Sequence, residues 1–342
     1  MASMKVGVEN AGALPEAEIR LDGLTFIAGV NGTGKSTVLK HVYAMMRVLA
    51  DSGAYGKLLE MKRDGRLHQD EAGLVLDGGL DARFSVRSVA EELRCEFRFP
   101  VQLREDQVRG RIDIRSGEGA GVPFIPQVVY YDSTSVLDMG NDTPRCGGPD
   151  HRQNLMRLLL EGRVRSATGE DAEKATSGRL YELVCRVVPG EFAVSESGAY
   201  LEYIGPEGTF STEDMADGMK LFSVLKILMD GEKLPIGSVL LLDDPDVHMH
   251  PEWQNILAEV IVLLVKQAGV RVVMTTHSQQ LALGVQAMSE RYGQHVDYYH
   301  FLRGEDGSTE CEDVTQNIGR IYEEMAAPYS AIANVLWSDI PE

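Results

Sequence analysis

The chain has 342 residues, of which 44% are hydrophobic and 25% charged, and its formal net charge is −19 at pH 7. This balance is typical of a folded globular protein, and the acidic charge argues against a nucleic-acid binder that works through a net basic field. Four dispersed cysteines indicate a reducing compartment rather than a disulfide framework. The dense apolar run at 260–265 is far shorter than the roughly 20 residues of a membrane span. We therefore expect a cytoplasmic protein without membrane contact.

Hydrophobic periodicity predicts the elements of the first half in chain order. Residues 24–29 predict a buried strand and residues 35–50 a helix. Three alternating stretches of an antiparallel meander follow at 82–87, 94–99 and 107–115. Residues 127–131 predict a further strand, and the Gly- and Pro-rich residues 140–150 predict a loop.

The second half begins with predicted helices at 151–161 and 172–187. It then alternates between helices at 215–229, 251–266 and 279–288 and strands at 238–242 and 271–275. Strand–helix alternation favours a mostly parallel sheet. The predicted fold class is therefore α/β, with a mostly parallel core sheet, an antiparallel β edge and a helical insertion. We expect one domain over 1–342, made of an N-terminal lobe, the insertion and a C-terminal part at 1–132, 133–210 and 211–342.

A phosphate loop is the strongest motif in the sequence. Residues 29–36, GVNGTGKS, match G-x-x-x-x-G-K-[ST] in full, between a predicted strand and a predicted helix. Glycines let backbone N–H groups surround phosphates, the Lys35 side chain can reach the β- and γ-phosphates, and the Ser36 hydroxyl can bind Mg²⁺. A chance Gly-rich turn explains this context poorly. The expected ATP contacts are Gly29, Asn31, Gly32, Thr33, Gly34, Lys35, Ser36 and Thr37.

Two acidic residues follow the apolar strand at 238–242, as a Walker B motif requires. We expect Asp243 to hold Mg²⁺ and Asp244 to polarise the attacking water. A further strand, at 271–275, runs into Thr276 and His277. Ligands of α/β sheets lie at the carboxyl ends of the strands, so His277 is a candidate sensor of the γ-phosphate. The predicted catalytic residues are thus Lys35, Asp244 and His277.

Together these motifs resemble the soluble ABC-type head ATPases of RecF, SMC and OLD (overcoming-lysogenization-defect) proteins. Residues 240–254, LLLDDPDVHMHPEWQ, are similar to the LLLDEPEVHLHPEWQ-type segment of that group, and residues 275–278, TTHS, resemble its switch region. The resemblance is specific over 1–50 and 210–290 and weak elsewhere. It implies a P-loop NTPase head that binds ATP and Mg²⁺ and forms an ATP-sandwich dimer or a higher homo-oligomer.

Such heads carry a signature motif that completes the ATP site of a second copy, and residues 215–220, MADGMK, occupy its position. The resemblance implies that Asp217 and Gly218 contact the partner's nucleotide. The usual motif has a serine at the position of Asp217, and a carboxylate there would be repelled by a γ-phosphate unless Mg²⁺ or a base intervenes. An ordinary helix cap stays open as the alternative.

Asp244 is a second departure, because the resembling proteins carry glutamate there. The shorter side chain withdraws the carboxylate by one carbon–carbon bond, and a misplacement of about 1 Å can lower a rate on the order of 10²-fold. Slow turnover and a backbone adjustment that restores the reach both stay open.

Three weaker signals have ordinary alternatives. His248 and His250 suggest a metal pair, although the resemblance places them in a loop beside the dimer interface. Gln127 or Asp132 is a candidate for a lid-coupling loop, against a solvated strand end. The basic residues of 151–165 suggest a partner or nucleic-acid surface, against a solvated helix face.

The favoured function is an ATPase that gates or scaffolds a partner effector in anti-phage defence, similar to the ATPase subunits of the PARIS and Septu systems. The chain after His277 is too short for the TOPRIM nuclease domain of OLD proteins, so the effector, a nuclease or toxin, would be a separate chain. A RecF-like repair ATPase is an alternative that the net charge disfavours. The nucleotide-binding subunit of a transporter is a further alternative, which the absence of a standard signature motif disfavours. The last alternative is an ATP-dependent scaffold that does not hydrolyse ATP, and it is based on the departures at Asp217 and Asp244.

Overall fold

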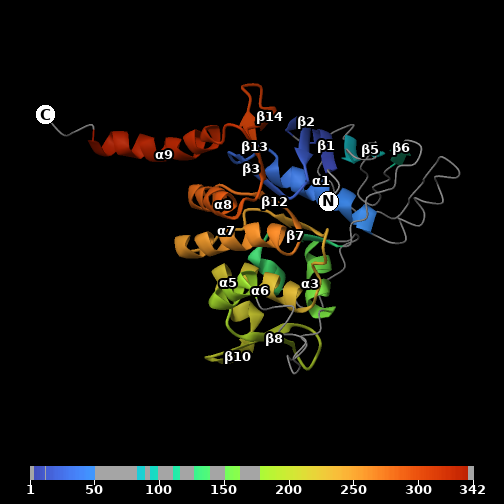
Figure 1. Ribbon diagram of the computed structural model, residues 1–342, viewed down its shortest axis with the longest axis vertical. Helices are drawn as coiled ribbons and strands as arrows, with labels where there is room; N and C mark the ends of the chain where they lie inside the picture. Colours follow the sequence, from blue (N-terminus) through green and yellow to red (C-terminus); the bar gives the residue numbers. More distant parts are fainter. Residues whose placement is uncertain are drawn as a thin grey trace.

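The computed structural model describes residues 4–11, 13–50, 83–88, 93–98, 111–115, 127–138, 151–161 and 178–337. A six-stranded mixed sheet forms the centre of the molecule (Figure 1). Its strands, in spatial order, are β14 (Thr309–Asp313), β13 (Val296–Arg303), β3 (Leu24–Gly29), β12 (Arg271–Thr275), β11 (Val239–Leu242) and β7 (Val128–Tyr131). Only the β13–β14 pair is antiparallel. The predicted mostly parallel core sheet is thereby confirmed.

The antiparallel β edge is confirmed as a second, five-stranded sheet. Its strands, in spatial order, are β2 (Leu14–Arg20), β1 (Met4–Ala11), β4 (Arg83–Ser88), β5 (Leu93–Arg98) and β6 (Arg111–Arg115). The last three correspond to the predicted meander, with ends displaced by at most four residues. β1 and β2 form a hairpin whose buried residues alternate with exposed ones, as expected for a sheet with one covered face.

Helices cover both faces of the central sheet (Figure 1). They are α1 (Lys35–Ala50), α3 (His151–Glu161), α5 (Arg179–Val187), α6 (Asp217–Asp230), α7 (Pro251–Lys266), α8 (Gln279–Tyr292) and α9 (Gly319–Trp337). Along β3, Phe26 packs with α5–α8 whereas its neighbour Ile27 packs with α1 and the hairpin. This alternation divides the core into two clusters, one on each face. None of the helices in these ranges combines the length and apolarity needed to cross a bilayer.

The range 133–210, predicted to be a helical insertion, is only partly helical. Besides α3, α5 and the short turn η1 (Thr134–Asp138), it contains most of an antiparallel sheet in the order β10-β9-β8. These strands are Gly208–Ser211, Leu201–Gly205 and Glu191–Val194. Rings of Phe192, Tyr203 and Phe210 pack across them with centroids 5.3 Å apart. β8–β10 lack the apolar run that spans the whole of the equally short strands β7 and β11, so pattern alone does not separate them from loop.

The ends of several predicted helices also change. α6 begins at Asp217 rather than at Met215, whose backbone is extended. α8 continues to Tyr292, where Gly293 ends it in a left-handed conformation. The predicted loop at 140–150 and the predicted helical residues 172–177 lie outside the described part of the chain. The division of the chain at 132/133 and 210/211 stays a prediction.

Candidate functional site

The phosphate loop lies between β3 and α1, as predicted, and its backbone requires glycine. Gly29 has φ +149° and Gly34 φ +86°, conformations that other residues rarely adopt. A Cβ atom on Gly29 would approach the Phe301 carbonyl oxygen to 2.4 Å, and one on Gly34 would approach Leu14 to 2.9 Å. Asn31 and Gly32 are exposed at the loop tip, and Thr33 is buried with its Oγ1 donating to the Val30 carbonyl at 2.9 Å. The loop is therefore a rigid, open turn.

Lys35 is the first residue of α1 and lies inside the loop. Its Nζ donates to the Gly29 carbonyl at 2.8 Å and to the Val30 carbonyl at 3.0 Å. Burial lowers the pKa of Lys35 below its usual value, although the carboxylates of Asp244 and Asp243 oppose the shift. An ammonium group held by neutral carbonyls in a partly desolvated loop is available to an incoming phosphate.

Asp243 directly follows β11, and three hydroxyl groups converge on its carboxylate. Ser36 Oγ donates to Oδ1 at 3.1 Å, Thr275 Oγ1 donates to Oδ1 at 2.7 Å, and Tyr130 OH donates to Oδ2 at 3.0 Å. Ser36 and Asp243 thus meet across the sheet although they are far apart in the sequence. The parallel order β3-β12-β11 brings their strand ends to one edge.

The donor set at this edge fits Mg²⁺. A serine hydroxyl and a carboxylate are hard oxygen ligands, and Mg²⁺ usually takes only one or two carboxylates and completes its shell with water and phosphate oxygens. No group of three or more His, Cys, Asp or Glu side chains in the described ranges could hold a metal by itself. The residues therefore suit a metal that arrives with a nucleotide, held by Ser36 and Asp243.

Asp244 and His277 face each other beside the loop. Asp244 Oδ2 lies 3.8 Å from His277 Nε2, while Asp244 Oδ1 is buried without a hydrogen-bond partner in the described part of the chain. Burial raises the pKa of Asp244 above its usual value, and the neighbouring Asp243 adds to the shift, against His277 and Lys35. An unpartnered buried carboxylate oxygen needs an explanation, and a bound water or ligand hydroxyl would satisfy it.

The backbone at Asp244 has an uncommon conformation. Its φ is +46°, and its N–H donates to Thr275 Oγ1 at 3.0 Å. Thr275 therefore fixes both acidic residues, by donating to Asp243 and accepting from Asp244. Thr37, the last predicted ATP contact, lies in the first turn of α1, where its carbonyl contacts His41 Nδ1.

Asp217 and Gly218 begin α6, away from this cluster. Among the described residues, no hydrogen bond or ion pair joins either of them to the phosphate loop. Asp217 Oδ1 lies 3.1 Å from Lys220 Nζ, which also binds Asp138 Oδ1 at 2.7 Å. Lys220 thus partly neutralises Asp217, whose role as a signature residue stays a prediction.

The structure corrects the weaker prediction for Gln127, whereas those for Asp132 and for the pair His248 and His250 stay untested. Gln127 precedes β7 and therefore lies at the edge opposite the strand carboxyl ends, so the lid-loop assignment to Gln127 is wrong. Asp132 follows β7 at the correct edge, but its carboxylate is held by Arg152 at 2.8 and 2.9 Å and by His151 at 2.9 Å. His250 caps α7, because its Nδ1 accepts from the Glu252 N–H.

Tyr130 and Thr275 were not predicted as site residues. Tyr130 lies inside an apolar strand, and its role depends on the β7–β11 register, which pairs Tyr131 with Leu242 and so places Tyr130 beside the Walker B strand. The Thr275-Thr276-His277 sequence at a strand end was visible, but only the strand order β3-β12-β11 shows that Thr275 reaches Asp243. Pattern within one segment does not contain that information.

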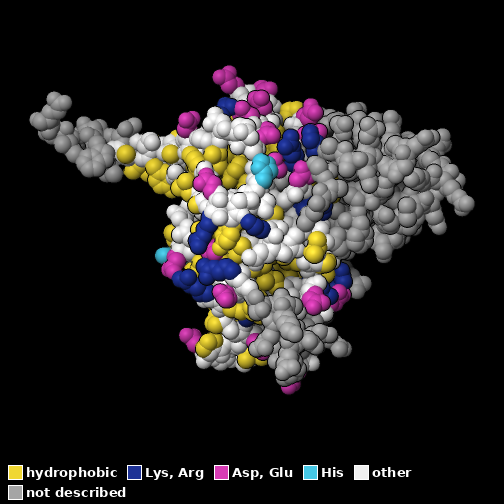
Figure 2. All heavy atoms as spheres, viewed as in Figure 1, with side chains coloured by type: hydrophobic (Ala, Val, Ile, Leu, Met, Phe, Trp, Pro, Cys, Tyr) yellow, Lys and Arg dark blue, Asp and Glu magenta, His cyan; other side chains and the backbone are white. Residues whose placement is uncertain are grey.

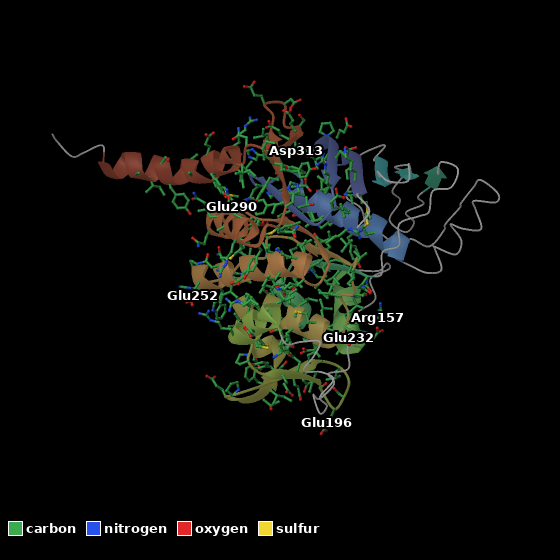
Figure 3. All side chains as sticks on the ribbon, in the orientation of Figure 1. Arg157, Glu196, Glu232, Glu252, Glu290 and Asp313 are labelled. Atoms are coloured by element: carbon green, nitrogen blue, oxygen red, sulfur yellow. The ribbon has the colours of Figure 1, made fainter. Side chains whose placement is uncertain are left out.

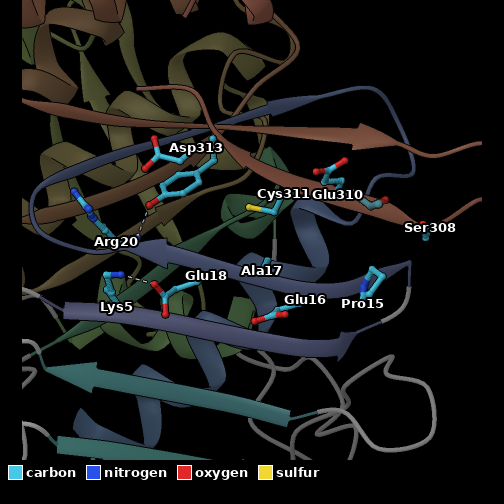
Figure 4. Close-up of a pocket in the computed structure, with 12 residues that line it drawn as sticks. Lys5, Pro15, Glu16, Ala17, Glu18, Arg20, Ser308, Glu310, Cys311 and Asp313 are labelled. Atoms are coloured by element: carbon cyan, nitrogen blue, oxygen red, sulfur yellow. Dashed lines mark hydrogen bonds and ion pairs between the residues drawn. The ribbon is translucent and has the colours of Figure 1, made fainter. Parts of the chain in front are cut away.

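A cavity that could suggest another site lies away from the phosphate loop. It has a volume of about 500 Å³ and lies between β2 and β14, the edge strands of the two large sheets (Figure 4). Carboxylates of Glu16, Glu18, Glu310 and Asp313 line it, and Lys5 pairs with Glu18 within it. These carboxylates would repel the phosphates of a nucleoside triphosphate, so this groove is not the expected nucleotide site.

Comparisons with known proteins agree with this geometry. A protein-family profile described as "AAA domain, putative AbiEii toxin, Type IV TA system" matches residues 140–283. The matched range contains α6, Asp243 and His277 and begins after the phosphate loop. No curated protein matches the sequence.

Solved structures of Smc heads superimpose on nearly the whole chain. The SmcHead bound to the C-winged helix domain of ScpA is 15% identical, has a TM-score of 0.56 and covers 94% of this chain and 99% of its own. The Smc head with a coiled coil and joint from Pyrococcus yayanosii is 11% identical, with a TM-score of 0.54 and coverages of 94% and 98%. The chain has the fold of an ABC-type ATPase head. The predicted fold class is thereby confirmed.

Proposed function

We propose that this ABC-type head binds ATP with Mg²⁺, hydrolyses it, and through the closing and opening of a two-copy assembly gates a separate partner protein. The observation that carries the proposal is the convergence of Ser36 and the Walker B carboxylate, with Asp243 Oδ1 3.1 Å from Ser36 Oγ. A phosphate loop alone can bind an anion, but this pairing adds a metal position at its mouth.

Each residue then has a chemical task. Lys35 exchanges its loop carbonyls for phosphate oxygens, and Ser36 and Asp243 hold the metal. Asp244 orients a water for attack and accepts its proton, which its pKa, raised by burial, favours. His277 contacts the γ-phosphate beside that water, a role supported by its distance of 3.8 Å from Asp244.

The partner copy completes the site through α6. Gly218 is buried against Trp253 and the His248 carbonyl, where a Cβ atom would approach both to 3.1 Å. Lys220 offsets the negative charge of Asp217 and thereby reduces the repulsion between this carboxylate and a γ-phosphate. ATP held between two copies would favour the closed assembly, and hydrolysis would release it.

The partner is a protein rather than nucleic acid. The net charge is −19, and five of the six peripheral side chains labelled in Figure 3 are acidic: Glu196, Glu232, Glu252, Glu290 and Asp313. One similar Smc head is bound to a domain of another protein, ScpA, and the matching family profile is associated with a toxin. The bound ScpA domain supports a separate protein partner, and the toxin named in the profile's description supports an effector of the toxin type. We propose an effector, a nuclease or toxin, that acts in anti-phage defence rather than in RecF-like repair.

Nucleotide binding by the Lys35→Ala variant tests the proposal. We expect Lys35→Ala to weaken the binding of Mg²⁺ and a fluorescent ATP analogue by at least about 10- to 100-fold, because it removes a charge-assisted phosphate contact. Lys40→Ala, at an exposed position of the same helix, is the matched control and should bind as the wild type does. Equal binding by both variants would contradict the site assignment.

A further inference from the structure

Tyr130 lies under the metal-binding carboxylate, on the sheet face that packs against α1. Its side chain is 1% exposed, and its hydroxyl donates to Asp243 Oδ2 at 3.0 Å. Burial and then the charge of Asp243 raise the pKa of Tyr130 far above its usual value. The hydroxyl therefore keeps its proton and remains a donor at all working pH values.

The contacts of Asp243 are divided between its two oxygens. Oδ1 accepts from Ser36 and Thr275, whereas among the described residues Oδ2 accepts from Tyr130. Metal binding would draw Ser36 away toward the ion, which leaves Thr275 and Tyr130 to fix the carboxylate plane. Hydrogen bonds to a ligating carboxylate set its orientation and its affinity for the metal.

The first turn of α3 in turn holds Tyr130. The His151 ring lies over it with centroids 4.5 Å apart, and the Tyr43 ring of α1 lies at 5.8 Å on another side. His151 Nε2 is 2.9 Å from Asp132 Oδ2, so the imidazole is anchored to the end of the same strand. Asn154, one turn along α3, donates to Tyr43 OH at 2.7 Å. A contiguous set of contacts thus runs from α3 to the metal carboxylate.

We propose that Tyr130 is a positioning residue for the Mg²⁺ carboxylate Asp243, and that the first turn of α3 holds it in place through the ring of His151. The inference rests on the proposed function and adds a route by which α3 acts on the metal site. Displacement of α3 frees the Tyr130 ring, loosens Asp243 and weakens Mg²⁺ binding without touching the phosphate loop.

The test compares Tyr130→Phe with Tyr131→Phe. Tyr131 is the adjacent residue, equally buried, and faces the opposite core cluster. The readout is the rise in Tm caused by saturating ATP, followed as a function of Mg²⁺ concentration, which reports binding rather than turnover. We expect Tyr130→Phe to raise the half-saturating Mg²⁺ concentration about 10-fold or more, with the full rise restored at high Mg²⁺. Tyr131→Phe should match the wild type.

The same measurement on two His151 variants tests the α3 step. His151→Phe keeps an aromatic ring over Tyr130 and should stay near the wild type, whereas His151→Ala should shift the Mg²⁺ dependence in the direction of Tyr130→Phe. A wild-type Mg²⁺ dependence for Tyr130→Phe, or equal shifts for the two His151 variants, would overturn the inference. No ATP-induced rise in the wild-type protein at any Mg²⁺ concentration would instead overturn the proposed function itself.

Discussion

The left-handed backbone at Asp244 gives a physical reason for aspartate at this position. With φ at +46° the residue lies in a region where Asp and Asn are several-fold enriched over longer side chains. The turn also re-aims the side chain toward His277. The shortened carboxylate and the unusual turn are therefore linked features of one site.

Substitution of Asp244 separates an ATPase from a scaffold. Asp244→Asn keeps the shape and tolerates the turn, and we expect it to bind ATP but release almost no phosphate. Asp244→Glu moves the carboxylate forward by about one bond, and we expect faster phosphate release, by up to about 10²-fold. Equal turnover in the wild type and Asp244→Glu would show that the shorter side chain does not limit the rate.

The buried carboxyl of Asp244 also predicts a pH dependence of stability. Its pKa is raised in the folded protein, chiefly by burial, so the folded state binds this proton more tightly than the unfolded state does. Ionisation therefore costs stability as the pH rises above about 4. The unliganded Asp244→Asn variant has no carboxyl group at this position to ionise, so it does not lose this stability. Its gain in free energy of unfolding over the wild type, from urea titration, should grow between about pH 4 and pH 7; a constant difference would contradict this account.

At the residue scale, the sequence predicts the motif residues but not Tyr130 and Thr275, which hydrogen-bond to them. Lys35, Ser36, Asp243 and His277 can be proposed from the sequence because each motif is local and its spacing is characteristic, and their roles stay predictions. Tyr130 was missed because nothing in a buried apolar strand distinguishes a tyrosine that packs from one that donates across the sheet. Strand register decides that role, and register comes from tertiary pairing.

At the scale of elements, the contact between α7 and α8 depends on the absence of a side chain. A Cβ atom on Gly284 would lie 2.9 Å from Ala258 Cβ, and Ala258 is fully buried. We expect Gly284→Ala to lower the free energy of unfolding by about 1–3 kcal/mol through overpacking. The double variant Ala258→Gly/Gly284→Ala exchanges the two positions and should recover part of the loss. Urea unfolding measures both, and an unchanged stability of Gly284→Ala would contradict close packing here.

The helices and strands were predicted correctly where the hydrophobic pattern or a start signal was strong. The boundaries of α1, α3, α7 and β12 agree with prediction, because each has a strong period or a clear start signal such as Pro251 after the His250 cap. The short strands β8–β10 were missed within a range predicted as helical. Ring contacts between different strands join Phe192, Tyr203 and Phe210, and the pattern within one strand does not reveal such contacts.

At the scale of the whole molecule, two features bear on assembly: the projecting helix α9 and the separation of the phosphate loop from α6. α9 projects from the body (Figure 1), and hydrophobic side chains gather where it leaves (Figure 2). Along it Tyr329 is 67% exposed and Ile332 59% exposed. The phosphate loop and the start of α6 are separate in one copy, so in the proposed two-copy assembly each copy would supply α6 to the nucleotide of the other.

The most direct test of the account is the light-scattering mass of the Asp244→Asn variant, which should bind ATP without consuming it. We expect the monomer mass without nucleotide, and with ATP in excess EDTA, and twice that mass with ATP and Mg²⁺. Lys35→Ala should stay monomeric under all three conditions. A mass that is the same with and without ATP and Mg²⁺ would contradict an assembly closed by nucleotide.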